Sequence, residues 1–220
     1  MTAANDINLR EEKAEDYRKV EEVTREAFWN HYSEGCDEHY LVHVMRGSAS
    51  FVKELAIVAE AEGKIVGNIM YTRAKILGDD GNVYPVLCFG PVSVLPSCQG
   101  KGIGTMLIEH SCSKARKLGY KAVLIYGDPE FYKRAGFVPA ERFGICTPDG
   151  MYAAALQARE LVKGALEGCA GSFAEDSVFE IDEKASTEFD KSFPHREKVS
   201  GLPSQKRFRE VAAMRRPRQA

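Results

Sequence analysis

Hydrophobic and polar positions alternate with two different periods in the first third of the chain. Residues 14–30 predict an amphipathic helix, because apolar side chains recur at helical spacing at Tyr17, Val20, Val23, Ala27 and Phe28. Residues 36–46 show the same spacing over a shorter length and predict a second helix. Residues 7–12 predict a short strand, and residues 55–77 predict a β-hairpin with its turn at Glu62-Gly63.

The following segment continues with alternating strands and helices. Residues 82–96 predict a strand rich in Val and Leu, but Pro91 in its middle cannot donate a ladder hydrogen bond, so we expect the strand to bulge or splay at Gly90-Pro91. An apolar stripe from Ile103 to Leu118 predicts a helix, and residues 121–126 predict a buried strand. Asp128 is the expected N-cap of a helix that begins at Pro129. This order predicts one domain of the α/β or α+β class.

Three glycines precede the helix that begins near Ile103, in the stretch CQGKGIGTMLIEH. A P-loop requires GxxxxGK[ST], and a dinucleotide fingerprint requires its third glycine at Thr105, so the stretch matches neither motif. A strand, a glycine turn and a helix N-terminus together expose backbone N–H groups that can bind an anion such as pyrophosphate. The alternative is a structural turn that only starts the helix.

Two motifs lie at a fixed distance from each other. Gln99 to Gly104 has the form Q-x-x-G-x-G, and the segment from Tyr132 to Phe137 has the form Y-x-x-x-G-F. Together they resemble the motifs of the GNAT superfamily of acetyl-CoA-dependent N-acetyltransferases. The resemblance covers roughly residues 5–157, and FGPVSVLP resembles a subgroup with Gly-Pro in this strand. It implies a mixed, twisted central sheet of about six to seven strands, flanked by helices and splayed between the fourth and fifth strands.

The resemblance also implies a site and a mechanism. The pyrophosphate of acetyl-CoA would bind the loop, at Gln99, Gly100, Lys101, Gly102, Ile103, Gly104 and Thr105. The pantetheine arm would pair with the backbone of Val92, Ser93 and Val94, and an N–H near Val92 would polarise the thioester carbonyl. Tyr132 would protonate the departing thiolate. Its alternative role is packing beside Phe131 and Phe137.

These implications predict an acyltransferase that moves the acetyl group of acetyl-CoA to a primary amine by direct attack in a ternary complex. The acceptor would be a small molecule or a protein. The first alternative is a non-catalytic, regulatory domain that binds acyl-CoA, and the second is a domain whose glycine loop is only structural. The resemblance also allows a homodimer.

A general base is missing from the predicted splayed strand, because CFGPVSV contains no carboxylate. A water chain or a residue of the acceptor side must serve instead. Candidates in the segment between the first two helices are Glu34, Asp37, Glu38, His39 and His43. This mixture would suit a cationic small amine as acceptor.

The same segment contains a metal-like pattern, C-x-x-H-x-x-x-H, at Cys36, His39 and His43. A structural zinc site needs a fourth ligand, and none is visible in the sequence, so we expect no metal. The neighbouring FWNHY, residues 28–32, is either a helix end packed on the core or an aromatic wall for the acceptor.

Composition excludes several classes of protein. The formal net charge of −2 gives no reason to expect nucleic acid or an acidic membrane as partner, and the sequence contains no stretch of about 18 apolar residues. The polar N-terminus is unlike a signal peptide, and six scattered cysteines without a CxxC pair favour reduced thiols. We therefore expect a cytoplasmic protein.

The C-terminal third gives conflicting signals. Residues 151–168 favour a helix by propensity, whereas the resemblance demands a strand over 151–157, and we follow the resemblance. We expect an acetyltransferase domain over residues 1–160 and an extension over 161–220 that packs on or beside it. Residues 185–193 predict a short helix stopped by Pro194. The arginine-rich end predicts a solvated helix and a frayed terminus.

Overall fold

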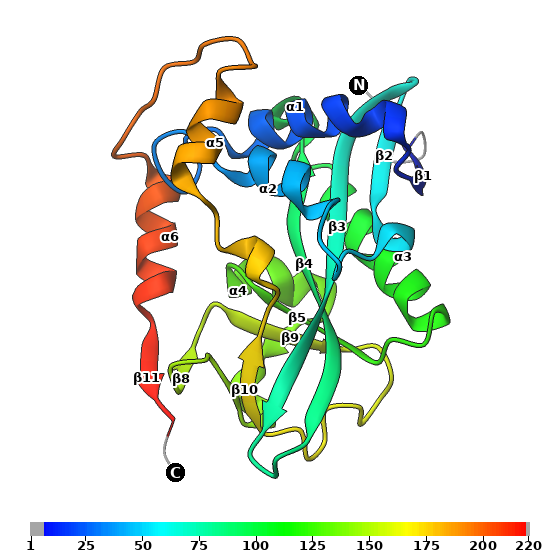
Figure 1. The fold of residues 1–220 in the computed structure, drawn as a ribbon, viewed down its shortest axis with the longest axis vertical. Coiled ribbons are helices and arrows are strands. Elements are labelled where there is room, and N and C mark those ends of the chain that lie inside the picture. Colours follow the sequence, from blue (N-terminus) through cyan, green and yellow to red (C-terminus); the bar gives the residue numbers. More distant parts are fainter. Residues whose placement is uncertain (1–6, 219–220) are drawn as a thin grey trace.

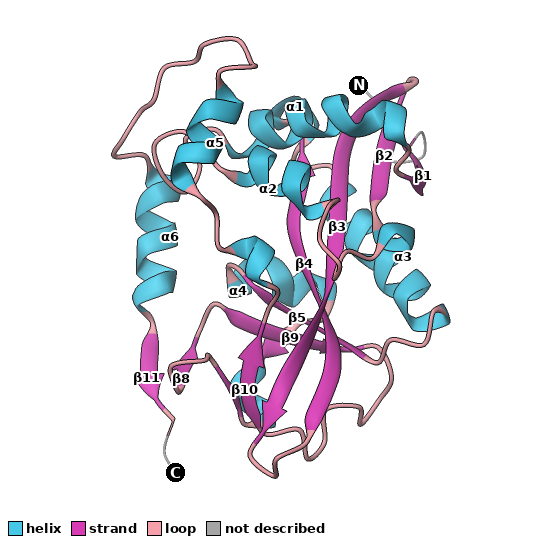
Figure 2. Cartoon of the chain, in the orientation of Figure 1, coloured by secondary structure: helices cyan, strands magenta, loops and turns pink. Residues whose placement is uncertain are grey.

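A nine-stranded mixed sheet forms the centre of the protein, seen here in a computed structural model that describes residues 7–218 (Figures 1 and 2). Residues 1–6, which contribute to the prediction about the N-terminus, and residues 219–220 lie outside the described part. In spatial order the main path is β1 (Ile7–Glu11), β2 (Ile57–Ala61), β3 (Lys64–Gly78), β4 (Val83–Val94), β5 (Ala122–Tyr126), β9 (Leu156–Glu160) and β6 (Val138–Pro139).

The predicted hairpin is formed by β2 and β3, which pair antiparallel. Its turn residues Glu62 and Gly63 both have positive φ angles, 52° and 71°. A two-residue turn of this kind matches the right-handed twist of the flanking strands. The glycine at the second position makes that backbone conformation accessible at little cost.

The predicted splay between the fourth and fifth strands is confirmed. Parallel pairing between β4 and β5 is limited to Leu87 with Val123 and Cys88 with Leu124. Beyond Cys88, β4 continues through Gly90-Pro91 to Val94 while it pairs with β3, and the β3–β4 register shifts between Ile69 and Tyr71. The backbone edge of β4 that faces β5 therefore opens after Cys88.

Helices cover both faces of the sheet, as consecutive residues of β3 show. Ile69 contributes to the core cluster under α3 (Ile103–Lys117), whereas Met70 packs in the cluster under α1 (Tyr17–Phe28) and α2 (Glu38–Met45). Because successive strand side chains point to opposite faces, α3 lies on one face and α1 and α2 lie on the other. The three predicted helices are confirmed, and α4 (Pro129–Tyr132) begins at the predicted position with Asp128 as its N-cap.

The C-terminal part adds strands to this framework. β8 (Met151–Ala153) and β9 confirm the strand that the resemblance demanded over the propensity for a helix. β10 (Gly171–Ala174) pairs antiparallel with the far end of β3 and parallel with β7 (Ile145–Cys146). The sheet therefore has nine strands instead of the expected six to seven, because β3 extends past β2 and exposes an edge that β10 covers, and β7 in turn pairs with β10.

The extension docks through charged and aromatic contacts. The α5 helix (Glu183–Asp190) places Asp190 2.6 Å from the buried Arg25 of α1. The α6 helix (Pro203–Ala213) places Arg207 2.7 Å from Asp128, the cap of α4. In Figure 1, α5 and α6 follow one another along one side of the molecule. Part of the extension therefore contacts the elements that carry the candidate site.

The expectation of a frayed basic end is wrong for residues 215–218. β11 (Arg215–Pro217) pairs with β8, and Arg215 and Arg218 form ion pairs with Asp149 and Asp79. Long-range ion pairing and strand pairing thus order an end that its composition alone described as solvated. All six cysteines are free thiols. No helix among residues 7–218 is both long enough and apolar enough to cross a membrane.

Candidate active site

The glycine loop has a backbone suited to an anion. After β4 a short 3-10 turn, Pro96–Cys98, leads to Gly100 and Gly102, whose φ angles of +74° and +83° lie in the left-handed region. Gly102 is the N-cap of α3 and provides no side chain to the first turn. The first N–H groups of a helix have no carbonyl partner within it, and they carry the positive end of the helix dipole. The Gln99 amide already donates to the Pro96 carbonyl at 3.3 Å, so the amides left for a ligand are those from Gly100 to Thr105.

Two polar side chains of the loop brace it. Gln99 Nε2 donates a hydrogen bond to the carbonyl of Val94 at 3.0 Å, and Lys101 Nζ donates one to the carbonyl of Ser97 at 3.0 Å. Contact of Lys101 with a phosphate would require its ammonium group to leave Ser97. The anion site is thus built mainly from backbone amides.

The end of β4 presents its backbone groups alternately to β3 and to the opening. The Ser93 carbonyl faces β3, because it lies 2.7 Å from the position that a Cβ of Gly67 would occupy. The Ser93 hydroxyl donates a hydrogen bond to the Thr24 hydroxyl at 3.2 Å. Because backbone groups alternate along a strand, Val92 and Val94 direct theirs to the opposite edge. The Val94 carbonyl already accepts from Gln99. Of the three predicted pantetheine partners, Val92 is the one most directly open to the gap.

Tyr132 occupies the last residue of α4, beside the gap between β4 and β5. Its half-buried ring packs against Phe89, Phe131 and Phe137, at centroid distances of 5.9, 4.9 and 5.6 Å. Burial raises the pKa of its phenol above the ordinary value, with smaller contributions from Tyr32 and Cys88. The residue therefore packs like a core aromatic and also keeps its proton at neutral pH, as a general acid requires.

Gly127, which belongs to neither of the two sequence motifs, fixes the position of the Tyr132 ring. A Cβ at residue 127 would lie 2.1 Å from Cε2 of Tyr132. The side-chain-free residue at the end of β5 therefore allows Tyr132 to lie directly against the backbone. A glycine directly after a buried strand was the available signal, but only the folded structure shows what approaches it.

We expect Gly127→Ala to reduce kcat by roughly 10- to 100-fold, because a displacement of about 1 Å at a reacting group has effects of this size. Acetyl-CoA affinity, measured by calorimetry, should change little. In the Tyr132→Phe background the same substitution should cost much less, since the hydroxyl it misplaces is gone. Equal effects in both backgrounds would contradict a role through Tyr132.

The five predicted base candidates have different surroundings in the structure. His39 is fully buried, 3.1 Å from Asp190, and burial lowers its pKa to about 4. His43 Nδ1 lies 2.9 Å from Glu21 Oε1. Asp37 accepts a hydrogen bond from Ser186, and Glu34 is exposed. These four are structural or surface residues.

Glu38 differs from the other four candidates in its environment. It is half-buried at the start of α2, and burial raises the pKa of its carboxyl to about 7. Burial raises the pKa of the nearby Tyr32 to about 12, with further contributions from the charges of Glu38 and Asp128. Tyr32 stacks on Phe208 of α6 at 4.8 Å. Within the FWNHY stretch, Phe28 thus packs in the core, whereas Tyr32 lies at the surface against Phe208, and a role of Tyr32 toward the acceptor stays a prediction.

A second carboxylate with a raised pKa was missed by the sequence search. Glu175 follows β10, and its Oε2 lies 3.9 Å from Sγ of Cys88, the last β4 residue paired with β5. Burial raises its pKa to about 7. It also contributes to the raised pKa of Tyr126, whose main cause is burial. No local motif marks this residue, because Cys88 lies 87 positions away in the chain.

The zinc alternative receives no support. Cys36 Sγ lies 3.5 Å from His39 Nδ1, but His43 turns to Glu21 instead. Between residues 7 and 218 no group of three or more His, Cys, Asp or Glu side chains is arranged to hold a metal ion. Instead, His39 lies between the aromatic rings of Phe189 and Phe193.

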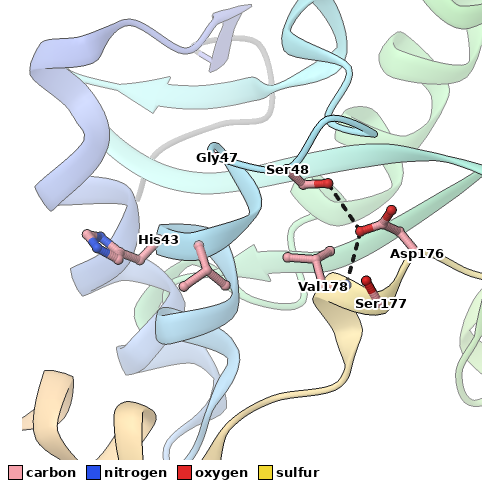
Figure 3. Close-up of a pocket in the computed structure, with 7 residues that line it drawn as sticks. His43, Gly47, Ser48, Asp176, Ser177 and Val178 are labelled. Carbon is pink, nitrogen blue, oxygen red and sulfur yellow. Dashed lines mark hydrogen bonds between the residues drawn. The ribbon is translucent and has the colours of Figure 1, made fainter.

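An open surface pocket of about 550 Å³ lies at the end of α2 (Figure 3), and neither Tyr132 nor the glycine loop lines it. It is lined by His43, Val44, Gly47, Ser48, Asp176, Ser177 and Val178. Asp176 accepts hydrogen bonds from the Ser48 hydroxyl at 3.1 Å and from the Val178 amide at 3.0 Å. The pocket therefore marks where the segment after β10 is anchored to α2.

Comparison with known proteins identifies the family. The model of the acetyltransferase (GNAT) domain matches residues 53–139, which include β4, the glycine loop and Tyr132. The uncharacterized N-acetyltransferase YjhQ of Escherichia coli is 34% identical over 125 residues, which are 56% of this chain and 65% of that protein. Residues 53–139 therefore carry a GNAT acetyltransferase domain. A second GNAT relative, the uncharacterized N-acetyltransferase YhbS of Escherichia coli, is 27% identical over 61% of this chain and 78% of its own length.

Solved GNAT structures show the same fold. The structure of Escherichia coli YhbS in complex with CoA superposes with a TM-score of 0.70 at 23% identity, over 80% of this chain and 93% of that one. A GNAT family acetyltransferase from Brucella melitensis in complex with acetyl-CoA gives a TM-score of 0.63 at 25% identity, over 79% and 97% of the two chains. The mixed, splayed sheet is therefore the GNAT fold.

Proposed function

We propose that this protein is an N-acetyltransferase that transfers the acetyl group of acetyl-CoA to a primary amine of a small-molecule or protein acceptor. The observation that carries the proposal is one juxtaposition. A glycine loop with left-handed Gly100 and Gly102, a β4 edge that opens after Cys88, and the phenol of Tyr132 surround one gap.

The relatives support acetyl-CoA as the co-substrate. YjhQ and YhbS are named N-acetyltransferases, and the Brucella melitensis neighbour was solved with acetyl-CoA. The residues of this chain suit the same ligand. Exposed amides at the loop can hold a pyrophosphate, and an unpaired strand edge can pair with the amide groups of a pantetheine arm.

The site would act mainly by positioning and by proton transfer. With the thioester held beside Val92, a backbone N–H of β4 can stabilise negative charge on the carbonyl oxygen. The acceptor nitrogen forms a bond to the carbonyl carbon while the bond from that carbon to sulfur breaks. Tyr132 then gives its phenolic proton to the departing thiolate, the nitrogen releases a proton to solvent as the amide forms, and the phenolate takes up a proton from solvent. Both substrates must be bound together, because the acetyl group passes directly from sulfur to nitrogen without an acyl-enzyme.

The surroundings of the gap favour a cationic acceptor. Glu38 and Glu175 contribute negative charge from two different elements, and Tyr32 with Phe208 adds an aromatic face. Carboxylates and aromatic faces both attract an ammonium group. Of the acceptors that fit the sequence, amines that carry positive charge at neutral pH are thus the ones we expect.

Calorimetric titration with acetyl-CoA, desulfo-CoA and ATP is the test of the cofactor. We expect acetyl-CoA and desulfo-CoA to bind and ATP to bind weakly, because only the first two offer a pantetheine arm to β4 in addition to a pyrophosphate. A folded sample that binds none of them would contradict the proposal. Turnover of acetyl-CoA with a panel of tyramine, putrescine and L-lysine then separates an enzyme from a non-catalytic acyl-CoA-binding protein.

A further inference from the structure

The GNAT framework of this protein lacks a base on its splayed strand. No residue of β4, Val83–Val94, carries a carboxylate or an imidazole. A primary amine with a pKa of about 10 is almost entirely protonated at neutral pH and cannot attack a thioester until it loses a proton. A group near the opening of β4 must therefore accept that proton, directly or through water.

The segment that follows β10 lies over the opening of β4. Glu175 Oε2 is 3.9 Å from Sγ of Cys88, and Phe179 Cε1 is 3.5 Å from the position that a Cβ of Gly90 would occupy. Cys88 and Gly90 are two residues apart and therefore face the same side of the strand. The segment 175–179 thus runs along β4 from its last pair with β5 into the splayed part.

The backbone on both sides of Glu175 is held in place. On one side, Ala174 pairs with Lys75 in the register of β10 with β3. On the other side, Asp176 is anchored by the Ser48 hydroxyl and by its own cap on the 3-10 turn Ser177–Phe179 (Figure 3). Among the ion pairs formed within residues 7–218, none involves Glu175. A fixed backbone therefore carries a carboxylate that is not neutralised by a cation.

We propose that Glu175, supplied by the C-terminal extension, is the general base that takes the proton from the acceptor amine. The inference rests on the proposed function and assigns to one residue the role that β4 leaves open. The ammonium proton passes to an Oε atom of Glu175, the free amine attacks the carbonyl carbon, the carbon–sulfur bond breaks, and Tyr132 protonates the thiolate. The nitrogen releases its second proton to solvent as the amide forms, and the Tyr132 phenolate takes up a proton from solvent. The proton on Glu175 then leaves to solvent, which the exposed side of the residue allows.

The environment of Glu175 suits this role. The residue is exposed overall, so an acceptor from solvent can reach it, while its carboxylate lies against the buried Cys88. Partial burial of the carboxyl group against Cys88 raises the pKa of Glu175 to about 7. A base is most effective when its pKa lies near the working pH, because it is then both largely deprotonated and sufficiently basic. A carboxylate with an ordinary pKa of about 4.3 would be a weaker base by more than two units.

Glu38 is the competing carboxylate, and its geometry differs. Its Oε2 accepts a hydrogen bond from the Asp37 amide at 3.2 Å, and its charge acts on Tyr32. Both contacts place it at the aromatic wall near α2. Glu175 instead contacts the strand that would hold the thioester. We therefore expect Glu38 to attract a cationic acceptor and Glu175 to deprotonate it.

The test compares Glu175→Gln, Glu38→Gln and Glu180→Gln with the wild type, using acetyl-CoA with the best amine of the panel. Glu180 is an exposed carboxylate five residues from Glu175 and serves as the control. Its charge contributes less than burial does to the raised pKa of Glu175, so Glu180→Gln should change kcat/KM only slightly. We expect Glu175→Gln to lower kcat/KM for the amine about 100-fold near pH 7, with acetyl-CoA affinity unchanged. The deficit should shrink toward about pH 10, where the free amine becomes abundant without a base. Glu38→Gln should mainly raise the KM for a cationic amine.

Two outcomes overturn the inference. If Glu175→Gln keeps the wild-type rate and pH profile, the base lies elsewhere, and transfer of the pH-dependent loss to Glu38→Gln would identify that residue instead. If the wild type binds acetyl-CoA but acetylates no amine of the panel, the proposed function fails and the inference fails with it. The two failures are distinct, since only the second removes wild-type turnover.

Thermal unfolding of Glu175→Gln measures whether the substitution lowers activity only by destabilising the fold. A carboxyl group whose pKa is raised by folding binds its proton more tightly in the folded state than in the unfolded state. The free energy of unfolding therefore falls as the pH rises from the ordinary pKa of the group through its folded pKa of about 7. The neutral amide of Glu175→Gln does not carry that penalty. The variant should therefore unfold at the same temperature as the wild type, or at a higher one, near pH 8. A lower unfolding temperature that accounts for the lost activity would overturn the assignment.

Discussion

Tyr132→Phe should lower kcat about 100-fold while acetyl-CoA binds as tightly as before. The substitution removes only the hydroxyl, and the remaining ring keeps its contacts with Phe89, Phe131 and Phe137. Because burial raises the pKa of the phenol, the wild-type residue holds a proton throughout the neutral range. Without it, the thiolate must leave unprotonated or take a proton from water. Steady-state kinetics and calorimetry on the same sample measure the two effects.

Tyr32→Phe is the matched control for this prediction. Tyr32 lies close enough to influence the pKa of Tyr132, and burial also raises its own pKa. Its hydroxyl belongs to the acceptor wall, so we expect a change in KM for the amine with kcat largely preserved. If kcat falls in Tyr32→Phe and not in Tyr132→Phe, the acid is Tyr32, and the role implied by the Y-x-x-x-G-F motif does not apply here.

Local patterns predicted the part of the fold that local interactions determine. The apolar stripe of α1, the hairpin turn at Glu62-Gly63 and the cap of α4 at Asp128 all depend on residues within a few positions of each other. The splay at Gly90-Pro91 was predictable for the same reason, because proline cannot join a ladder. Residues 151–160 needed the resemblance, since their helical propensity is overridden by pairing of β9 with β5.

The parts that escaped prediction depend on partners far away in the sequence. β10 becomes a strand of the central sheet because β3 has a free edge at Lys75 to Gly78. Arg207 contacts Asp128, the cap of α4, although 79 positions separate them in the sequence. Glu175 contacts Cys88, which is 87 positions away. No window of sequence contains both partners of such a contact. The base candidates between the first two helices were chosen by chain neighbourhood, and three-dimensional packing assigned most of them to the interface with α5.

The three glycines of the loop have different roles, which their backbone angles reveal. Gly100 and Gly102 have φ angles of +74° and +83°, whereas Gly104 belongs to the first turn of α3. A Cβ on Gly104 would meet Phe131 at 3.5 Å, an ordinary contact distance, and a Cβ on Gly102 would meet nothing within 4 Å. The demand for glycine at position 102 therefore comes from the backbone conformation. At position 104 neither a left-handed backbone nor a close neighbouring atom requires glycine.

Gly102→Val should reduce acetyl-CoA affinity at least 30-fold. Left-handed backbone costs an L-residue roughly 1–2 kcal/mol, and a β-branched side chain resists it most strongly, so the loop should relax to another conformation. The amides that surround the anion would then diverge, and a loss of about 2 kcal/mol corresponds to roughly a 30-fold weaker complex. Because position 102 caps α3 at the surface, the sheet should remain folded.

Gly104→Ala is the control that isolates this effect. It adds a methyl group to the same loop without a left-handed backbone, so acetyl-CoA affinity should stay within about threefold of the wild type. Calorimetric titration of both variants, with circular dichroism to confirm the fold, completes the comparison. If Gly102→Val binds acetyl-CoA like the wild type, the loop is only a turn before α3. The pyrophosphate must then bind elsewhere, because an amide cradle cannot survive the loss of the conformation that forms it.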